Sequence, residues 1–110
     1  MLALLLNTPR TDEEWARWSF AHRDSHTRIR QAIQSTKNTM LPDYQLEPIF
    51  QQDLQGWLQR NSQMHQDFSG VLGVESFDLL DVDFKDEKSI QAWAYLHYQA
   101  HYNAEAALGI

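Results

Sequence analysis

The residues best suited to chemistry are five histidines, which follow tryptophans at fixed spacings. Three times a tryptophan is followed by a polar residue four positions on and by a histidine eight positions on: Trp18-His22-His26, Trp57-Asn61-His65 and Trp93-His97-His101. Neutral imidazoles are good ligands for zinc and similar divalent ions. If His26, His65 and His101 met at one point, they would hold such an ion and leave a fourth coordination position open to water.

The same histidines have a second interpretation, as polar residues inside a helical core. A polar residue repeated in an apolar stripe fixes helix register when each ring is hydrogen-bonded. The partner would be a neighbouring side chain, a backbone carbonyl or an acidic linker residue such as Asp81 or Asp83. This structural role needs no cofactor, and the sequence favours it because spacing alone does not show that the rings converge.

The repeat extends on both sides of the histidines. Matching residues lie three positions before each tryptophan and 4, 8, 11 and 15 positions after it, which is one stripe of an amphipathic helix. The three copies span residues 7–36, 46–74 and 82–110, and Asn7, Leu46 and Val82 are equivalent in the approach segments. The predicted structural core consists of Trp15, Trp18, Trp57, Trp93, His22, Asn61, His97, Ile33, Leu72 and Leu108.

Three helices are needed to position these residues, so we expect an all-α fold. The first begins after Thr11, which forms a capping box with Glu14, and ends near Thr36. The second runs from about Gln51 to Val71, and the third from Asp86 as its cap to about Ala107. Residues 1–110 are therefore predicted to form one domain, a small three-helix bundle with residues 1–10 as an N-terminal arm.

Two connections of about fifteen residues leave the helix directions open. Fifteen extended residues span up to about 50 Å, whereas a helix of twenty residues is about 30 Å long. Each connection could therefore return the chain to its starting end. Parallel helices would then place equivalent residues in shared layers around a pseudo-threefold axis. An antiparallel bundle is nevertheless the more usual arrangement for a small helical protein.

Composition excludes several classes of function. The 110 residues carry 9 Lys and Arg against 15 Asp and Glu, a net charge of -6 that argues against nucleic-acid binding. The absence of cysteine excludes thiolate metal sites and cysteine nucleophiles. The longest apolar run, Leu2 to Leu6, is too short for a membrane span, so we expect a soluble product. No nucleophile elbow or phosphate-binding loop is present, and we expect no enzymatic activity.

The helical segments WSFAHRDSH, WLQRNSQMH followed by LGV, and WAYLHYQAH with a terminal ALGI resemble a family of small proteins from tailed bacteriophages. The resemblance covers nearly the whole chain. It implies a structural protein of the virion, encoded in the assembly region, with no family catalytic residues. A head-to-tail adaptor or connector subunit is the first expectation within that class. Capsid decoration, tail-fibre attachment and a minor internal role are the alternatives.

Two surfaces are expected to contact portal, tail or capsid proteins, or further copies in a homo-oligomer. The first is the N-terminal arm with Leu2, Leu4, Leu5 and Leu6, although a groove on the same domain would cover it equally well. On the assembly interpretation, deletion of residues 1–6 leaves the fold intact. The second surface comprises Arg17, Arg23, Arg28 and Arg30, a local basic face on an acidic protein.

Overall fold

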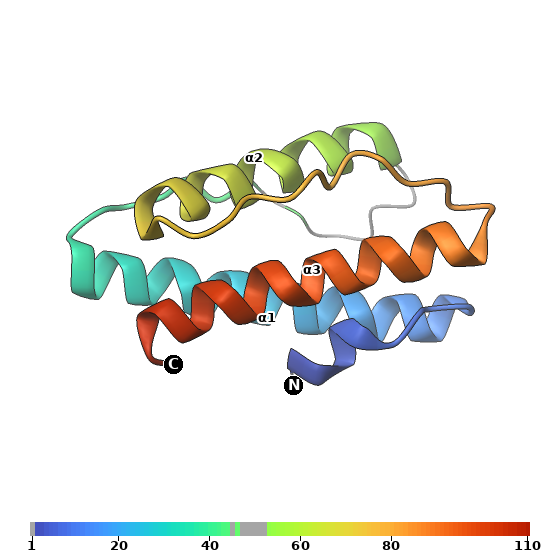
Figure 1. The fold of residues 1–110 in the computed structure, drawn as a ribbon, viewed down its shortest axis with the longest axis horizontal. Coiled ribbons are helices and arrows are strands. Elements are labelled where there is room, and N and C mark those ends of the chain that lie inside the picture. The colour runs from blue at the N-terminus through green and yellow to red at the C-terminus, as the bar shows by residue number, and fades with distance from the viewer. Residues whose placement is uncertain (1, 45, 47–52) are drawn as a thin grey trace.

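Three long helices form the fold of this computed structural model, which describes residues 2–44, 46 and 53–110. A short 3-10 helix, η1 (Leu2–Leu6), precedes α1 (Asp12–Lys37), α2 (Leu54–Leu72) and α3 (Glu87–Leu108). No strand occurs among the described residues. The molecule measures 40 × 23 × 23 Å, and its two equal short dimensions fit three helices packed around a common axis (Figure 1). The predicted all-α three-helix bundle is confirmed.

Each helix begins at a side-chain cap and ends at a residue in the left-handed conformation. Thr11 accepts a hydrogen bond from the backbone N–H of Glu14, and Asp53 and Asp86 cap α2 and α3 in the same way. Gly73 and Gly109 close α2 and α3 at φ of 68° and 70°, where glycine avoids the steric cost of a Cβ. The predicted boundaries hold to within a few residues, and Gln51, the predicted start of the second helix, lies outside the described residues.

The three helices are parallel to one another. Figure 1 shows α1, α2 and α3 all running from the same end of the molecule to the other, with the connection between α2 and α3 returning alongside them. The side-chain layers agree, because Trp18, Trp57 and Trp93 stack with ring centroids 5.0–6.4 Å apart. The usual antiparallel arrangement is therefore wrong for this chain. The long connections allow the parallel alternative, and equivalent residues of the repeat meet in layers.

The tryptophan layer also ties the helices to the segments that precede them. The indole Nε1 of Trp18 donates to the carbonyl of Leu5, that of Trp57 to Leu46 and that of Trp93 to Leu79, at 3.4, 3.0 and 3.0 Å. All three leucines are buried. In the structure Leu46 is thus equivalent to Leu5 and Leu79, whereas the sequence repeat aligns it with Asn7 and Val82. The segments between these leucines and their tryptophans differ in length, so an alignment that counts back a fixed number of residues from each tryptophan is wrong here.

The N-terminal segment belongs to the core of its own domain. It packs against α1 and α3, where Leu5 is fully buried beside Trp18. Leu2 and Leu4 are partly buried against the same cluster, and Leu6 alone of these leucines is exposed. The expectation that this arm is free for a partner is therefore wrong for Leu5. The groove that covers it is on the same chain.

This placement gives a direct test by mutation. Leu5→Ala is expected to lower the free energy of unfolding by about 2–5 kcal/mol, because it leaves a cavity beside the tryptophan layer. Leu6→Ala is the matched control, since the Leu6 side chain is 42% exposed and its loss should change stability by less than about 0.5 kcal/mol. Urea unfolding followed by tryptophan fluorescence measures both. Equal, small effects would show that the N-terminal segment does not pack as described.

Candidate metal centre

The histidines occupy the middle of the bundle, between two apolar clusters. Trp18, Trp57 and Trp93 dominate the cluster on one side, while Ile29, Ile33, Met64, Phe68 and Ala104 form the other. All five histidines are buried. Each lies on the inward stripe of its helix because the steps of three and four residues keep it facing the bundle axis.

Four of the histidines converge on one point. His22 and His26 come from α1, His65 from α2 and His101 from α3, and one ring nitrogen of each lies within 4.8 Å of all the others. The Nε2 atoms of His22 and His26 are 3.0 Å apart. Tetrahedral zinc with Zn–N bonds of 2.0–2.1 Å separates its ligand nitrogens by about 3.3 Å. The longest separation must therefore close by about 1.5 Å, an adjustment shared between two side chains.

Several ring nitrogens in this cluster lack hydrogen-bond partners. Both nitrogens of His65 are buried and unpartnered, as are Nδ1 of His26 and Nε2 of His101. His65 is only 2% exposed, so its ring nitrogens have almost no contact with bulk solvent. A buried polar group without a partner costs about 1–3 kcal/mol. A metal ion at the centre of the cluster would give His65 the partner it lacks.

The fifth histidine is in a different situation. His97 Nδ1 lies 3.0 Å from the carbonyl of Trp93, and its Nε2 lies 2.7 Å from the side-chain amide of Asn61. The ring therefore donates through Nδ1 and accepts from Asn61 through Nε2. Both nitrogens are used, so His97 fits the structural interpretation and has no lone pair left for a metal.

Burial keeps the histidines neutral. It lowers the pKa of His26 and of His97 to about 3, and it lowers the pKa values of His22, His65 and His101 well below 6.5. Mutual repulsion among the rings acts in the same direction for His22, His65 and His101. Metals bind the neutral imidazole, so at pH 7 no proton has to leave before a metal enters.

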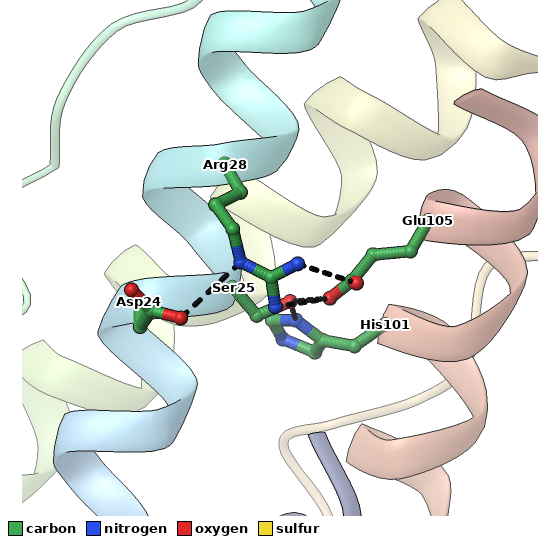
Figure 2. A network of polar contacts seen from close by, with 5 residues as sticks. All are labelled: Asp24, Ser25, Arg28, His101 and Glu105. Atoms are coloured by element: carbon green, nitrogen blue, oxygen red, sulfur yellow. Dashed lines mark hydrogen bonds and ion pairs between the residues drawn. The ribbon is translucent and has the colours of Figure 1, made fainter. Parts of the chain in front are cut away.

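A chain of polar contacts orients His101 toward the centre (Figure 2). Ser25 donates to Oε2 of Glu105 at 2.5 Å, and His101 Nδ1 lies 2.6 Å from the Ser25 oxygen. Because the serine proton goes to the carboxylate, Nδ1 of His101 must carry a proton and donate it to Ser25. Nε2 then holds a free lone pair. Arg28 bonds both oxygens of Glu105, at 3.0 and 3.2 Å, and fixes the carboxylate.

Ser25 is therefore the outer partner of His101, and Glu105 holds Ser25 in that position. Such partners change metal affinity by about 10–100-fold. Glu105→Gln is expected to weaken zinc binding by that factor, because the amide is a poorer acceptor for Ser25 and carries no negative charge. Competition with a chromophoric chelator measures the affinity. Glu13→Gln, which removes an exposed partner of Arg17, is the control and should leave it unchanged.

The acidic residues expected to bond the histidines do not do so. Asp81 and Asp83 are both exposed, and Asp83 accepts a hydrogen bond from the backbone of Lys85. The carboxylate that reaches the histidine layer is Glu105, near the end of α3. An acidic residue in the last turns of a helix is ordinarily exposed, so nothing in the sequence distinguishes it.

The four arginines do not form one free basic face. Arg28 bonds Asp24 and Glu105, Arg17 pairs with Glu13, and Arg30 lies 3.8 Å from Asp43. Arg23 is exposed. Intramolecular carboxylates therefore offset much of the positive charge that was assigned to a partner.

The residues predicted to form the structural core all face the interior of the bundle, but they are buried to different extents. Trp18, Trp57, Trp93, His22, Asn61, His97 and Ile33 are buried, whereas Trp15, Leu72 and Leu108 are partly buried against the two apolar clusters. The layer predicted for His22, Asn61 and His97 is present: Asn61 bonds His97, and the ring centroids of His22 and His97 are 5.3 Å apart. Nε2 of His22 also faces Nε2 of His26 in the next layer.

The sequence held a signal for this fourth ligand. His22 and His26 are four residues apart on one helix, a spacing that puts both rings on the same face. In the second layer Asn61 stands where the repeat has a histidine on the other two helices, and it bonds His97 and not His22. If a metal were bound, the coordination position expected to be open to water would be occupied by His22.

Comparison with known proteins adds no relative to this description. The chain matches no protein family, no curated protein and no solved structure. The resemblance to phage proteins consequently stays a prediction. Within the described part of the chain, no helix combines the length and apolar character needed to cross a membrane.

Proposed function

We propose that this protein is a metal-binding helical domain that holds one transition-metal ion through His22, His26, His65 and His101. The main support for this proposal is the environment of His65. Its two ring nitrogens are buried without partners at the point where the other three rings converge. A purely structural histidine would be hydrogen-bonded, as His97 is. His22 and His26 face each other through Nε2, and His65 and Nε2 of His101 complete a set of four nitrogens from which a metal could be held.

The chemistry of the ligands selects the metal. Imidazole nitrogen suits zinc, copper, nickel and iron, whereas magnesium and calcium require oxygen ligands. Four protein ligands close a tetrahedral zinc site, and closed sites are structural because no position remains for water or substrate. We therefore assign the centre a stabilising or metal-holding role without catalysis.

Titration of zinc into protein freed of metal by a chelator tests this proposal. We expect one equivalent to bind, with native mass spectrometry recording the added mass. At a free zinc concentration 1,000 times the dissociation constant, stability should rise by about 4 kcal/mol, and the midpoint of thermal unfolding by roughly 15 °C. Magnesium at the same concentration should change neither quantity. A melting temperature indifferent to zinc would refute the metal centre.

The resemblance to phage proteins supports a second proposal, that the domain is a structural subunit of a virion. A head-to-tail adaptor or connector is the first candidate, with capsid decoration, tail-fibre attachment or an internal role as alternatives. Exposed aromatic side chains at Phe20, Tyr95 and Tyr102 offer surfaces for contact with other subunits or copies. The two proposals are compatible, since a closed metal site would stiffen an assembly subunit. The same native mass spectrum reports the subunit number, and a monomer at all concentrations would count against self-assembly.

A further inference from the structure

A pocket between α1 and α2 reaches one of the proposed ligands. It has a volume of about 350 Å³, within the range of small-molecule sites. His26 lies in its wall, together with Thr27, Arg23 and Arg30 of α1, Met64 of α2 and Asp43 of the connection. The pocket therefore borders the histidine cluster at His26.

The internal repeat shows what this pocket lacks. At the interface of α3 and α1, His101 and Glu105 lie 8 and 12 residues after Trp93, and Ser25 lies 7 residues after Trp18. The pseudo-threefold rotation superposes α3 on α1 and α1 on α2. It places His26 at the position of His101, Arg30 at that of Glu105 and Met64 at that of Ser25. A carboxylate and a hydroxyl at one interface are thus replaced by a guanidinium and a thioether at the other.

His26 is left with a nitrogen that needs an acceptor. Its Nε2 faces Nε2 of His22, so Nδ1 is on the far side of the ring, where it is buried and unpartnered. The equivalent atom of His101 donates to Ser25. When a metal occupies Nε2 of a histidine, Nδ1 keeps its proton and requires a carboxylate, carbonyl or water oxygen. Met64 and Arg30 offer no such oxygen.

We propose that the α1/α2 pocket binds a small oxyanion, inorganic or carboxylate, that completes the outer shell of His26. An oxygen of the anion accepts the hydrogen bond from Nδ1, and Arg23 and Arg30 supply the opposite charge. This inference rests on the proposed metal centre. The anion takes the part at this interface that Ser25, held by Glu105, takes at the other.

The charges around the pocket permit an anion. Arg30 has Asp43 as a neighbour at 3.8 Å, and the Asp43 side chain is 66% exposed, so their attraction is weakened by solvent. Among the described residues that line the pocket, Asp43 supplies one carboxylate, against the two guanidinium groups of Arg23 and Arg30. A bound anion would share Arg30 with Asp43 or displace it.

Metal and anion should then strengthen each other's binding. Thermodynamic linkage requires the same factor in both directions. Outer-shell partners of metal-bound histidines are worth about 10–100-fold in affinity, so a saturating anion should tighten zinc binding at least about tenfold. Zinc should tighten anion binding by the same factor.

The test is zinc affinity measured by chelator competition in sodium chloride, sodium sulfate and sodium succinate at equal ionic strength. Calorimetric titration of sulfate and of succinate into the protein with and without zinc accompanies it. Tighter zinc binding in sulfate alone identifies an inorganic oxyanion, and in succinate alone a carboxylate ligand; either supports the proposal. Arg30→Gln and Arg23→Gln should abolish the effect, and Arg30→Lys should retain part of it. Arg17→Gln, an exposed arginine of α1 outside the pocket, is the control.

The two failures are distinguishable. One equivalent of zinc bound with the same affinity in all three salts would overturn the anion pocket and leave the metal centre standing. The anion pocket is also overturned if Arg17→Gln reduces the effect as much as Arg30→Gln does. Absence of zinc binding in every salt would refute the metal centre, and with it the linkage proposed for His26.

Discussion

Metal-free protein is expected to unfold cooperatively between pH 6 and pH 5. All five histidines are buried with lowered pKa values, so the native state excludes protons that the unfolded chain binds below about 6.5. Because each folded-state pKa is depressed, the stabilisation is complete above pH 6.5 and is lost as the pH falls. The loss sums over five groups to about 4 kcal/mol at pH 6.0 and about 7 kcal/mol at pH 5.5.

These energies approach the entire stability of a domain of this size, which is about 5–15 kcal/mol. Helical circular dichroism recorded from pH 8 to pH 4 with a chelator present should show a sharp transition that takes up nearly five protons. His65→Leu should reduce that number by one. A saturating metal should move the midpoint to lower pH, because protons must then displace it. Stability unchanged between pH 8 and pH 5 would mean that the histidines are exposed and the layers wrongly assigned.

Replacing His65 is expected to separate stability from metal binding. His65→Leu removes two unpartnered polar atoms from a buried position and puts an apolar side chain of similar size there. The metal-free variant should be more stable than the parent by about 1–3 kcal/mol. Its zinc affinity should fall well over 100-fold, since a ligand is worth more than the outer-shell partners that contribute about 10–100-fold.

His97→Leu is the matched control for this experiment. His97 is as deeply buried, but its hydrogen bonds to Trp93 and Asn61 are complete, so the variant should lose about 1–3 kcal/mol by leaving the Asn61 amide unpaired. Its zinc affinity should stay within a few-fold of the parent. Urea unfolding and chelator competition measure the two quantities. If both variants lose stability and both keep their zinc affinity, His65 is a structural histidine and the centre is misassigned.

Much of the helical architecture was predictable because it depends on short-range chemistry. Thr11 and Asp86 cap helices with their own side chains, and glycine at 73 and 109 tolerates the left-handed conformation that ends them. The tryptophan and histidine stripe fixed which face of each helix is buried. Three of the four converging histidines followed from the repeat alone.

The helix directions depended on information that the spacing does not carry. A connection long enough to return the chain permits parallel helices and does not require them. The carbonyls of Leu5 and Leu79 bind the tryptophan indoles through backbone atoms, which every residue type has. The apolar run Leu2 to Leu6 left a partner and a groove on the same domain equally open, and the folded chain shows that Leu5 is buried in its own domain.

The fourth ligand and its surroundings were missed for a different reason. His22 joins the cluster because Asn61 and His97 bond each other, a pairing across two helices that only the folded chain reveals. Glu105 becomes an inner carboxylate because Arg28 and Ser25 meet it at the α1/α3 interface. The positions of His22 and Glu105 both depend on the helices being parallel, and the sequence left the helix directions open.

X-ray absorption at the zinc edge of the loaded protein tests the four-histidine centre most directly. The account predicts four nitrogen ligands at about 2.0–2.1 Å, with the outer-shell scattering of imidazole rings, at one zinc per chain. His65→Leu should lose one imidazole from that shell, while His97→Leu should keep all four. A shell of oxygen ligands, or one unchanged by His65→Leu, would contradict the assignment of zinc to His22, His26, His65 and His101.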